Sequence, residues 1–155
     1  MFIQRADLFR GMDHEVIKQI STIMVEESCA EGTVLFERGK SANDLYVVKE
    51  GTVELIIGEN GHVTYVVKNV GEAFGWSSLV NHHVYTATAV CSSPTKLIRI
   101  QSERLNEIFE RYPASGLMFF RRLAEIISKR VATSYNLLLR SHERTSRYLR
   151  SVGSI

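Results

Sequence analysis

The feature that most limits the possible folds is a series of short apolar runs between residues 25 and 100. The runs occupy residues 34–36, 45–48, 53–57, 63–67, 85–91 and 96–100. The pair Asn60-Gly61 separates the third run from the fourth. Because an Asn-Gly pair between apolar runs is a strong hairpin signal, we expect these runs to form antiparallel strands. Several short strands at regular spacing predict a barrel or a jelly roll.

Helical patterns flank this β-rich region. Asp13 is expected to cap an amphipathic helix that ends near Met24. After the last strand, Ser102 is expected to cap a helix over residues 103–112. Pro113 then lies in the favoured first turn of a long helix.

The predicted fold is mainly β, with a β-roll or jelly-roll barrel and N-terminal helices over residues 1–112. A long helix of the dimerisation type is expected over residues 113–141, followed by a basic tail over residues 142–155. Residues 104–155 hold ten Lys/Arg and four Asp/Glu, whereas residues 1–103 hold nine and thirteen. This positive end suits a nucleic-acid partner, and it equally suits a solvated helix face.

The long helix carries an apolar seam with heptad spacing. The seam consists of Leu117, Phe120, Ala124, Ile127, Val131, Ser134 and Leu138. This is an a/d pattern over about three heptads. A helix of about 25 residues is about 38 Å long, which is more than a small barrel covers. The seam packs either on its own barrel or on the same helix of a second copy, and we expect a homodimer through residues 117–138.

Composition places the chain among ordinary globular proteins. Of its 155 residues, 45% are hydrophobic and 23% are charged. No apolar run reaches the ~18 residues of a membrane span, and the first residues lack the apolar core of a signal peptide. We therefore expect a cytoplasmic protein without a membrane partner. Cys29 and Cys91 lack metal-type spacing and are expected to be buried, reduced thiols.

The sequence Gly-Glu-Ala-Phe-Gly-Trp-Ser-Ser-Leu at residues 71–79 carries the clearest functional signal. Gly75 allows a tight turn and a close backbone approach. Ser77 and Ser78 are then expected in the first turn of a short helix, where unpaired backbone N–H groups attract anions. The pattern predicts a small phosphate cradle between strands.

Five segments resemble, in order, the motifs of the cyclic-nucleotide-binding domain family. They are residues 8–12, 32–39, 44–51 and 71–75, together with the small residue Ala87. The resemblance covers roughly residues 5–145, and it is strongest to the effector domain of bacterial Crp/Fnr-type transcription regulators. It implies a β-roll flanked by helices, with a ligand held between the roll and the long helix.

The resemblance places the phosphate-binding cassette of the family at residues 71–87, and two substitutions in this cassette bear on the ligand. Cyclic-nucleotide binders of this family have a Glu for the ribose 2′-OH where this chain has Trp76, and an Arg for the cyclic phosphate where it has Tyr85. The Trp side chain only donates hydrogen bonds, and Tyr is neutral where Arg offers a charged fork. Because hydrogen bonds to a charged group contribute about 1.5–3 kcal/mol each, the two losses together should weaken binding about 100-fold or more.

Other groups could still hold an anion. They are the backbone N–H groups of residues 76–78, the hydroxyls of Ser77, Ser78 and Thr86, and protonated His82 or His83. We do not expect the two histidines to be metal ligands, because no Cys or carboxylate cluster is near them in the sequence. In the family, the long helix touches the base at a turn that here offers one hydroxyl, that of Ser128. The expected ligand-binding residues are Gly75, Trp76, Ser77, Ser78, Tyr85, Thr86, Ala87 and Ser128.

The expected function is that of a ligand-sensing regulatory module, in transcription regulation or signalling, that acts on a dimerising helix. No catalytic triad, Walker motif or Rossmann motif is present, so we expect no enzyme. No cofactor is certain, and the ligand is expected to be a cyclic nucleotide (cAMP or cGMP) or another small anionic or aromatic molecule. In one alternative, Trp76 fills the pocket as core and the chain is a ligand-free scaffold. In another, it is the effector half of a DNA-binding regulator, with DNA as a partner only through a further C-terminal domain.

Overall fold

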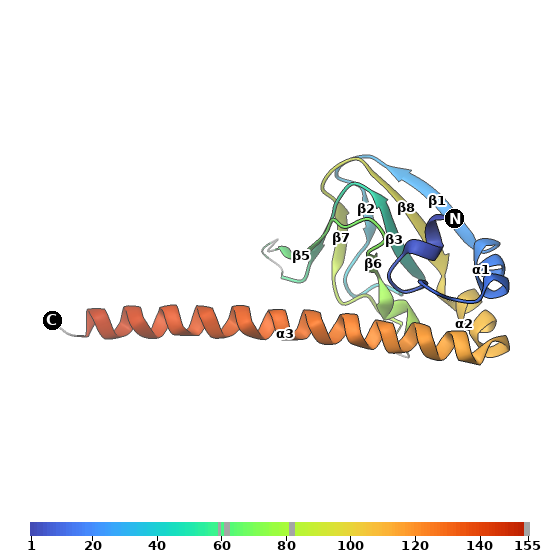
Figure 1. The fold of residues 1–155 in the computed structure, drawn as a ribbon. Helices are drawn as coiled ribbons and strands as arrows, with labels where there is room; N and C mark the ends of the chain where they lie inside the picture. Colours follow the sequence, from blue (N-terminus) through green and yellow to red (C-terminus); the bar gives the residue numbers. More distant parts are fainter. Residues whose placement is uncertain (59, 61–62, 81–82, 154–155) are drawn as a thin grey trace. The chain divides into compact units, whose positions relative to one another are not determined.

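The computed structural model describes residues 1–58, 60, 63–80 and 83–153 (Figure 1). The chain divides into two compact units, Met1–Phe119 and Phe120–Ile155, and each is described here by itself. In the part of the chain that is described, none of the helices is long and apolar enough to span a membrane.

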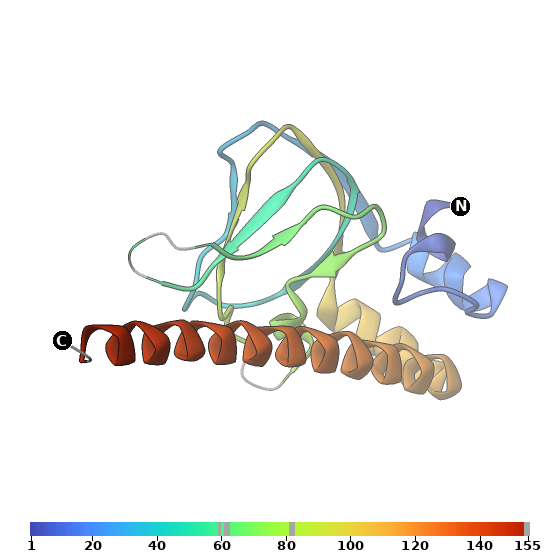
Figure 2. The ribbon, with the colours of Figure 1, turned by 60° about the vertical axis from the view of Figure 1, so that its left-hand side comes forward.

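The first unit is a roll of antiparallel strands (Figures 1 and 2). One sheet has the order β1-β8-β3-β6, and the other has the order β2-β7-β4-β5. The strands are β1 (Met24–Cys29), β2 (Val34–Phe36), β3 (Asp44–Glu50), β4 (Val53–Ile56), β5 (Val63–Val67), β6 (Ala73–Phe74), β7 (Thr88–Cys91) and β8 (Thr95–Gln101). The predicted mainly β fold with flanking helices is confirmed.

A hydrophobic cluster joins the two sheets from inside the roll. The first sheet contributes Tyr46, Val48, Phe74 and Leu97, and the second contributes Phe36, Val53, Val67, Ala89 and Cys91. Alternation along the strands explains this, since successive side chains of a strand point to opposite faces. Burial of each large apolar side chain contributes about 1.5–3 kcal/mol to folding.

Several strands differ from the prediction at their ends. β1 was not predicted: residues 24–29 form a strand because they pair with β8 over their whole length. Residues 85–87 are not strand, and β7 begins at Thr88. The turn expected at Asn60-Gly61 lies partly outside the described residues, but β4 and β5 on either side of it pair antiparallel as predicted.

Two helical segments precede the roll, η1 (Phe2–Arg5) and α1 (His14–Ser21). The predicted cap of α1 is confirmed, since the Asp13 carboxylate accepts a hydrogen bond from the Glu15 N–H at 2.9 Å. The predicted end near Met24 is wrong, because α1 ends at Ser21 and Met24 already belongs to β1.

After the roll come α2 (Ser102–Arg111) and α3 (Pro113–Val152). Ser102 is not the cap of α2 but its first residue, and Gln101 holds the cap position. The predicted start of α3 at Pro113 is confirmed. Phe119, in the first turns of α3, packs against Phe9 and Phe109 with ring centroids 5.2 and 4.9 Å apart.

α3 is longer than predicted. The expected helix end at residue 141 is wrong, and the expected tail is helical as far as Val152. No proline or glycine interrupts residues 117–152, and Gly153 follows the last helical residue. The second unit is therefore one continuous helix from Phe120 to Val152.

Candidate functional site

The cassette contains a left-handed turn at Gly75. The residue links β6 to the short 3₁₀ helix η2 (Trp76–Leu79) and has a φ of 79°. A Cβ at this position would lie 3.1 Å from the Asp44 carbonyl oxygen and 3.1 Å from Cδ2 of Tyr46. Only glycine combines this backbone conformation with so close an approach. The tight turn predicted for Gly75, and the short helix predicted after it, are both present.

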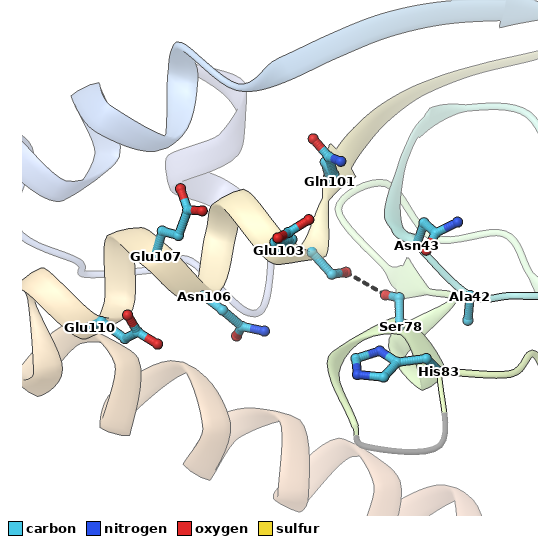
Figure 3. A pocket seen from close by; sticks show the side chains of 10 residues that line it. Ala42, Asn43, Ser78, His83, Gln101, Glu103, Asn106, Glu107 and Glu110 are labelled. Carbon is cyan, nitrogen blue, oxygen red and sulfur yellow. Dashed lines mark hydrogen bonds between the residues drawn. The ribbon is translucent and has the colours of Figure 1, made fainter.

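The hydroxyl of Ser78 forms hydrogen bonds within the protein. Its hydroxyl donates to the Gly75 carbonyl at 2.8 Å, and its side chain is 1% exposed. The same hydroxyl shares a hydrogen bond with that of Ser102 in the first turn of α2 (Figure 3). Ser78 therefore ties η2 to α2 and is not free to bind a ligand through its hydroxyl.

Tyr85 is a core residue. Its ring stacks on Phe36 with centroids 3.8 Å apart and an interplanar angle of 11°. Its hydroxyl donates to the Asp44 carbonyl at 2.9 Å and accepts from the Asp44 N–H at 3.2 Å. Burial raises the pKa of Tyr85, so the phenol stays neutral at physiological pH. Tyr85, at the position where the family has Arg, is therefore part of the core of the roll and carries no charge.

The other predicted site residues are less enclosed. Trp76, Ser77 and Ala87 are half-buried, and Thr86 is exposed. Ser128 is exposed on α3 in the second unit, so its place in the site stays a prediction. His83 is exposed with a φ of 42°, and His82 lies outside the described residues. Among the described residues, no group of three or more His, Cys, Asp or Glu is placed to hold a metal ion.

A cavity of about 570 Å³ lies beside the cassette, between η2 and α2 (Figure 3). Polar and acidic side chains dominate its lining. They are Asn43, Ser78, His83, Gln101, Ser102, Glu103, Asn106, Glu107 and Glu110, joined by Ala42. The three carboxylates make this cavity unfavourable for an anion such as a cyclic phosphate.

A second cavity, of about 410 Å³, lies on the side of Tyr85 that faces β2 and the start of β3. Phe36, Tyr46 and Tyr85 are among its lining residues, together with Lys40 and Asp44. The Asp44 carboxylate is 3.4 Å from Nη1 of Arg99, whose Nε is 2.6 Å from Glu27. Burial raises the pKa of Asp44, and Arg99 opposes this effect through its charge and its hydrogen bond.

Sequence reasoning missed four residues that shape the site. Asp44, Phe36 and Tyr46 surround Gly75 and Tyr85, and Ser102 holds Ser78. Phe36 and Tyr46 lie in apolar runs that already predicted strands, but which face of each strand meets the cassette depends on the pairing of β2 with β7 and of β3 with β6. No sequence signal links Ser102 to Ser78, 24 residues away.

Comparison with known proteins identifies the class of the roll and its cassette. The family model for the cyclic nucleotide-binding domain matches residues 26–112. Since this is more than half of the chain, the protein belongs to the cyclic nucleotide-binding domain family. The resemblance predicted from the sequence is confirmed.

Individual relatives support the same assignment. The structure of a Geobacter metallireducens protein, provisionally named a cyclic nucleotide-binding protein, is 29% identical with a TM-score of 0.74, over 83% of this chain and 95% of that one. The N-terminal domain of a Streptomyces coelicolor transcriptional regulator is 28% identical with a TM-score of 0.68, over 83% and 92%. The human cyclic nucleotide-gated channel beta-3 is 24% identical over 85% of this chain.

The chain spans only 17% of that channel's length, so the similarity is to one domain of a larger protein. The family fixes the kind of domain, and its relatives include channels and transcription regulators.

Proposed function

We propose that this domain is a ligand-sensing regulatory module that takes a small anionic ligand, a cyclic nucleotide (cAMP or cGMP) in the first place, into the cassette of residues 71–87. The observation that carries the proposal is the left-handed turn at Gly75, which leads directly into η2 within a domain of this family. This turn brings the backbone of the cassette against Asp44 and Tyr46.

The ligand contacts in this module differ from those of cyclic-nucleotide binders in the family. Trp76 offers no acceptor for a ribose hydroxyl, and the Tyr85 hydroxyl is already bonded to Asp44. The remaining contacts are the backbone N–H group of Ser77 and the hydroxyls of Ser77 and Thr86, since the Ser78 N–H donates to the Gly75 carbonyl at 3.2 Å. We expect the affinity for a cyclic nucleotide to be about 100-fold lower than that of a cassette with both charged contacts.

We further propose that ligand binding is coupled to a homodimer formed through α3. Three residues of the predicted seam, Phe120, Val131 and Leu138, are 37%, 44% and 66% exposed in the single chain. An apolar seam of this length needs a partner, and identical seams of two copies satisfy each other in a closed dimer. A ligand that binds one arrangement of the dimer more tightly would shift the population toward it. The output would lie in signalling or transcription regulation.

Trp76 provides the test of ligand binding, because it is the only tryptophan and lies in the cassette. Its fluorescence is followed during titration with cAMP and with cGMP, and free tryptophan in the same titration corrects for absorption by the nucleotide. A saturable change in the micromolar to millimolar range is expected. No fluorescence change and no heat of binding up to millimolar ligand would contradict the proposal.

The packing of Tyr85 favours a second candidate. Because Tyr85 completes an aromatic core and carries no charge, the domain could serve as a dimerisation scaffold that binds no ligand. In that case the dimer forms through α3, and its stability is independent of any cyclic nucleotide. Sedimentation with and without saturating nucleotide separates the two functions.

A further inference from the structure

The two cysteines of the chain lie at one corner of the roll. Cys29 is the last residue of β1, and Cys91 is the last residue of β7. The β1–β2 connection runs beside the β7–β8 connection, so β1 pairs with β8 before the corner and β2 pairs with β7 after it. The two cysteines therefore belong to different sheets although the corner brings them together.

Thr95 is a common neighbour of both cysteines. It is the cross-strand partner of Cys29, and such partners have Cβ atoms about 5 Å apart. Its hydroxyl donates to the Thr52 and Ser93 carbonyls at 3.2 and 2.9 Å, and its side chain lowers the pKa of the Cys91 thiol. Backbone bonds hold the corner closed, from Gly32 N–H to the Cys91 carbonyl at 2.7 Å and from Cys91 N–H to the Thr33 carbonyl at 2.9 Å.

Both side chains also belong to the same part of the core, since Cys91 is a member of the core cluster and Cys29 packs against that cluster. Burial raises the pKa of the Cys91 thiol, the Thr95 side chain lowers it, and the Cys29 thiol raises it again. Cys29 is half-buried and packs against the core cluster, while Cys91 is 0% exposed. An oxidant from solution therefore reaches Cys29 first.

We propose that Cys29 and Cys91 are a redox modification site, which a small disulfide such as oxidised glutathione converts into an intramolecular disulfide. The Cys29 thiolate attacks one glutathione sulfur, so that a protein–glutathione disulfide forms and one glutathione leaves as thiolate. The Cys91 thiolate then attacks the Cys29 sulfur, and the second glutathione leaves. Two protein thiols are oxidised, and one oxidised glutathione is reduced to two thiols.

The bond would join the two sheets at the corner. β7 begins at Thr88, directly after the cassette, so a link from Cys91 to β1 fixes the strand on which the cassette ends. Intracellular disulfides are uncommon, and those that form are often redox-sensing. The inference does not depend on which ligand the cassette takes.

The test is to incubate the folded, reduced chain with oxidised glutathione and to analyse it by non-reducing peptide mapping. The expected product is a peptide pair joined through Cys29 and Cys91, with a mass two hydrogens below that of the reduced pair. The thermal midpoint should rise by about 5 °C or more, because the bond closes a long loop, and it should return on reduction.

Single variants separate the two steps. Cys91→Ser should stop at a mixed disulfide of one glutathione on Cys29, whereas Cys29→Ser should leave Cys91 unmodified in the folded chain. The proposal is overturned if both wild-type thiols stay free, if the wild type accumulates a stable mixed disulfide, or if only disulfides between two chains form. Circular dichroism of each variant confirms that it is folded before the comparison.

Discussion

At Gly75 the chain adopts a conformation that a residue with a side chain tolerates poorly. Its φ is 79°, and a Cβ at this position would lie only 3.1–3.4 Å from atoms of Asp44, Tyr46 and Phe36. Gly39 has a similar φ of 84° but meets no atom within 4 Å. The two positions therefore share the backbone cost of a side chain and differ only in the contacts that the side chain would make.

Replacement of these glycines separates strain from packing. Gly75→Ala should lower the free energy of unfolding by about 2–4 kcal/mol, and Gly39→Ala by only about 1–2 kcal/mol, because both variants share the left-handed backbone cost and only the first adds close contacts. Urea unfolding measures both values. Equal losses at the two positions would show that the close approach at Gly75 does not constrain the cassette.

The Tyr85 hydroxyl offers a second test at the residue scale. Tyr85→Phe keeps the stack on Phe36 but removes the acceptor for the Asp44 N–H and the donor to the Asp44 carbonyl. We expect a loss of about 1–3 kcal/mol, since two part-buried backbone groups lose their partner. Tyr135→Phe is the control, because Tyr135 is 63% exposed. If the two variants have the same stability, the hydroxyl of Tyr85 does not hold β3 in place.

Among the elements, β1, β8 and β3 are linked by a charged chain on the surface of their sheet. Arg99 of β8 bridges Glu27 of β1 and Asp44 of β3. Arg99 partly offsets the effect of burial on Asp44, whose pKa is still raised above its ordinary value. A raised carboxyl pKa means that the folded state binds a proton more tightly than the unfolded state. Asp44 therefore stabilises the fold at low pH, and this contribution is lost as pH rises through its folded pKa.

The raised pKa of Asp44 predicts how the stability difference between the wild type and Asp44→Asn depends on pH. Relative to the variant, the wild type should lose stability as pH rises from 3.8, the ordinary Asp value, through the raised pKa of Asp44. Thermal unfolding of both proteins across this range gives the difference directly, and groups common to both proteins cancel. A wild type that gains stability over the variant as pH rises would mean that Arg99 outweighs burial.

The seam of α3 is the other element with a testable role. Val131→Lys and Leu138→Lys should each weaken dimerisation at least tenfold, because a charge at an a position is buried in the paired helices. Leu137→Lys is the matched control, since Leu137 is 59% exposed and lies outside the seam. Sedimentation velocity over a range of concentrations measures the dimer. A seam variant that dimerises like the control would contradict dimerisation through α3.

At the scale of the whole molecule, the sequence was sufficient to predict the roll. The glycine-separated apolar runs predicted six of its strands, β2, β3, β4, β5, β7 and β8, because strand alternation and turn residues are local signals. β1 was missed, since its residues become strand only by pairing with β8, which is far away in the chain. The predicted end of α3 at residue 141 was also wrong, because the arginines that follow it are good helix formers and the helix continues to Val152.

The site was predicted less completely than the fold. The positions of Gly75 and η2 followed from the residue types, but the role of Tyr85 did not. Its polar hydroxyl suggested a ligand contact, whereas it packs on Phe36 and bonds to Asp44, which are 49 and 41 residues away. Long-range contacts of this kind decide whether a polar side chain faces a ligand or the core, and they leave no local pattern.

The most direct test of ligand binding in the cassette compares the wild type with the double variant Trp76→Glu/Tyr85→Arg, which restores both charged contacts of the family. Calorimetric titration with cAMP and cGMP measures the affinity of each, and circular dichroism confirms that both are folded. We predict weak but saturable binding to the wild type, and affinity about 100-fold higher in the folded variant. Absence of binding to the wild type, or equal affinities in the two proteins, would contradict this prediction.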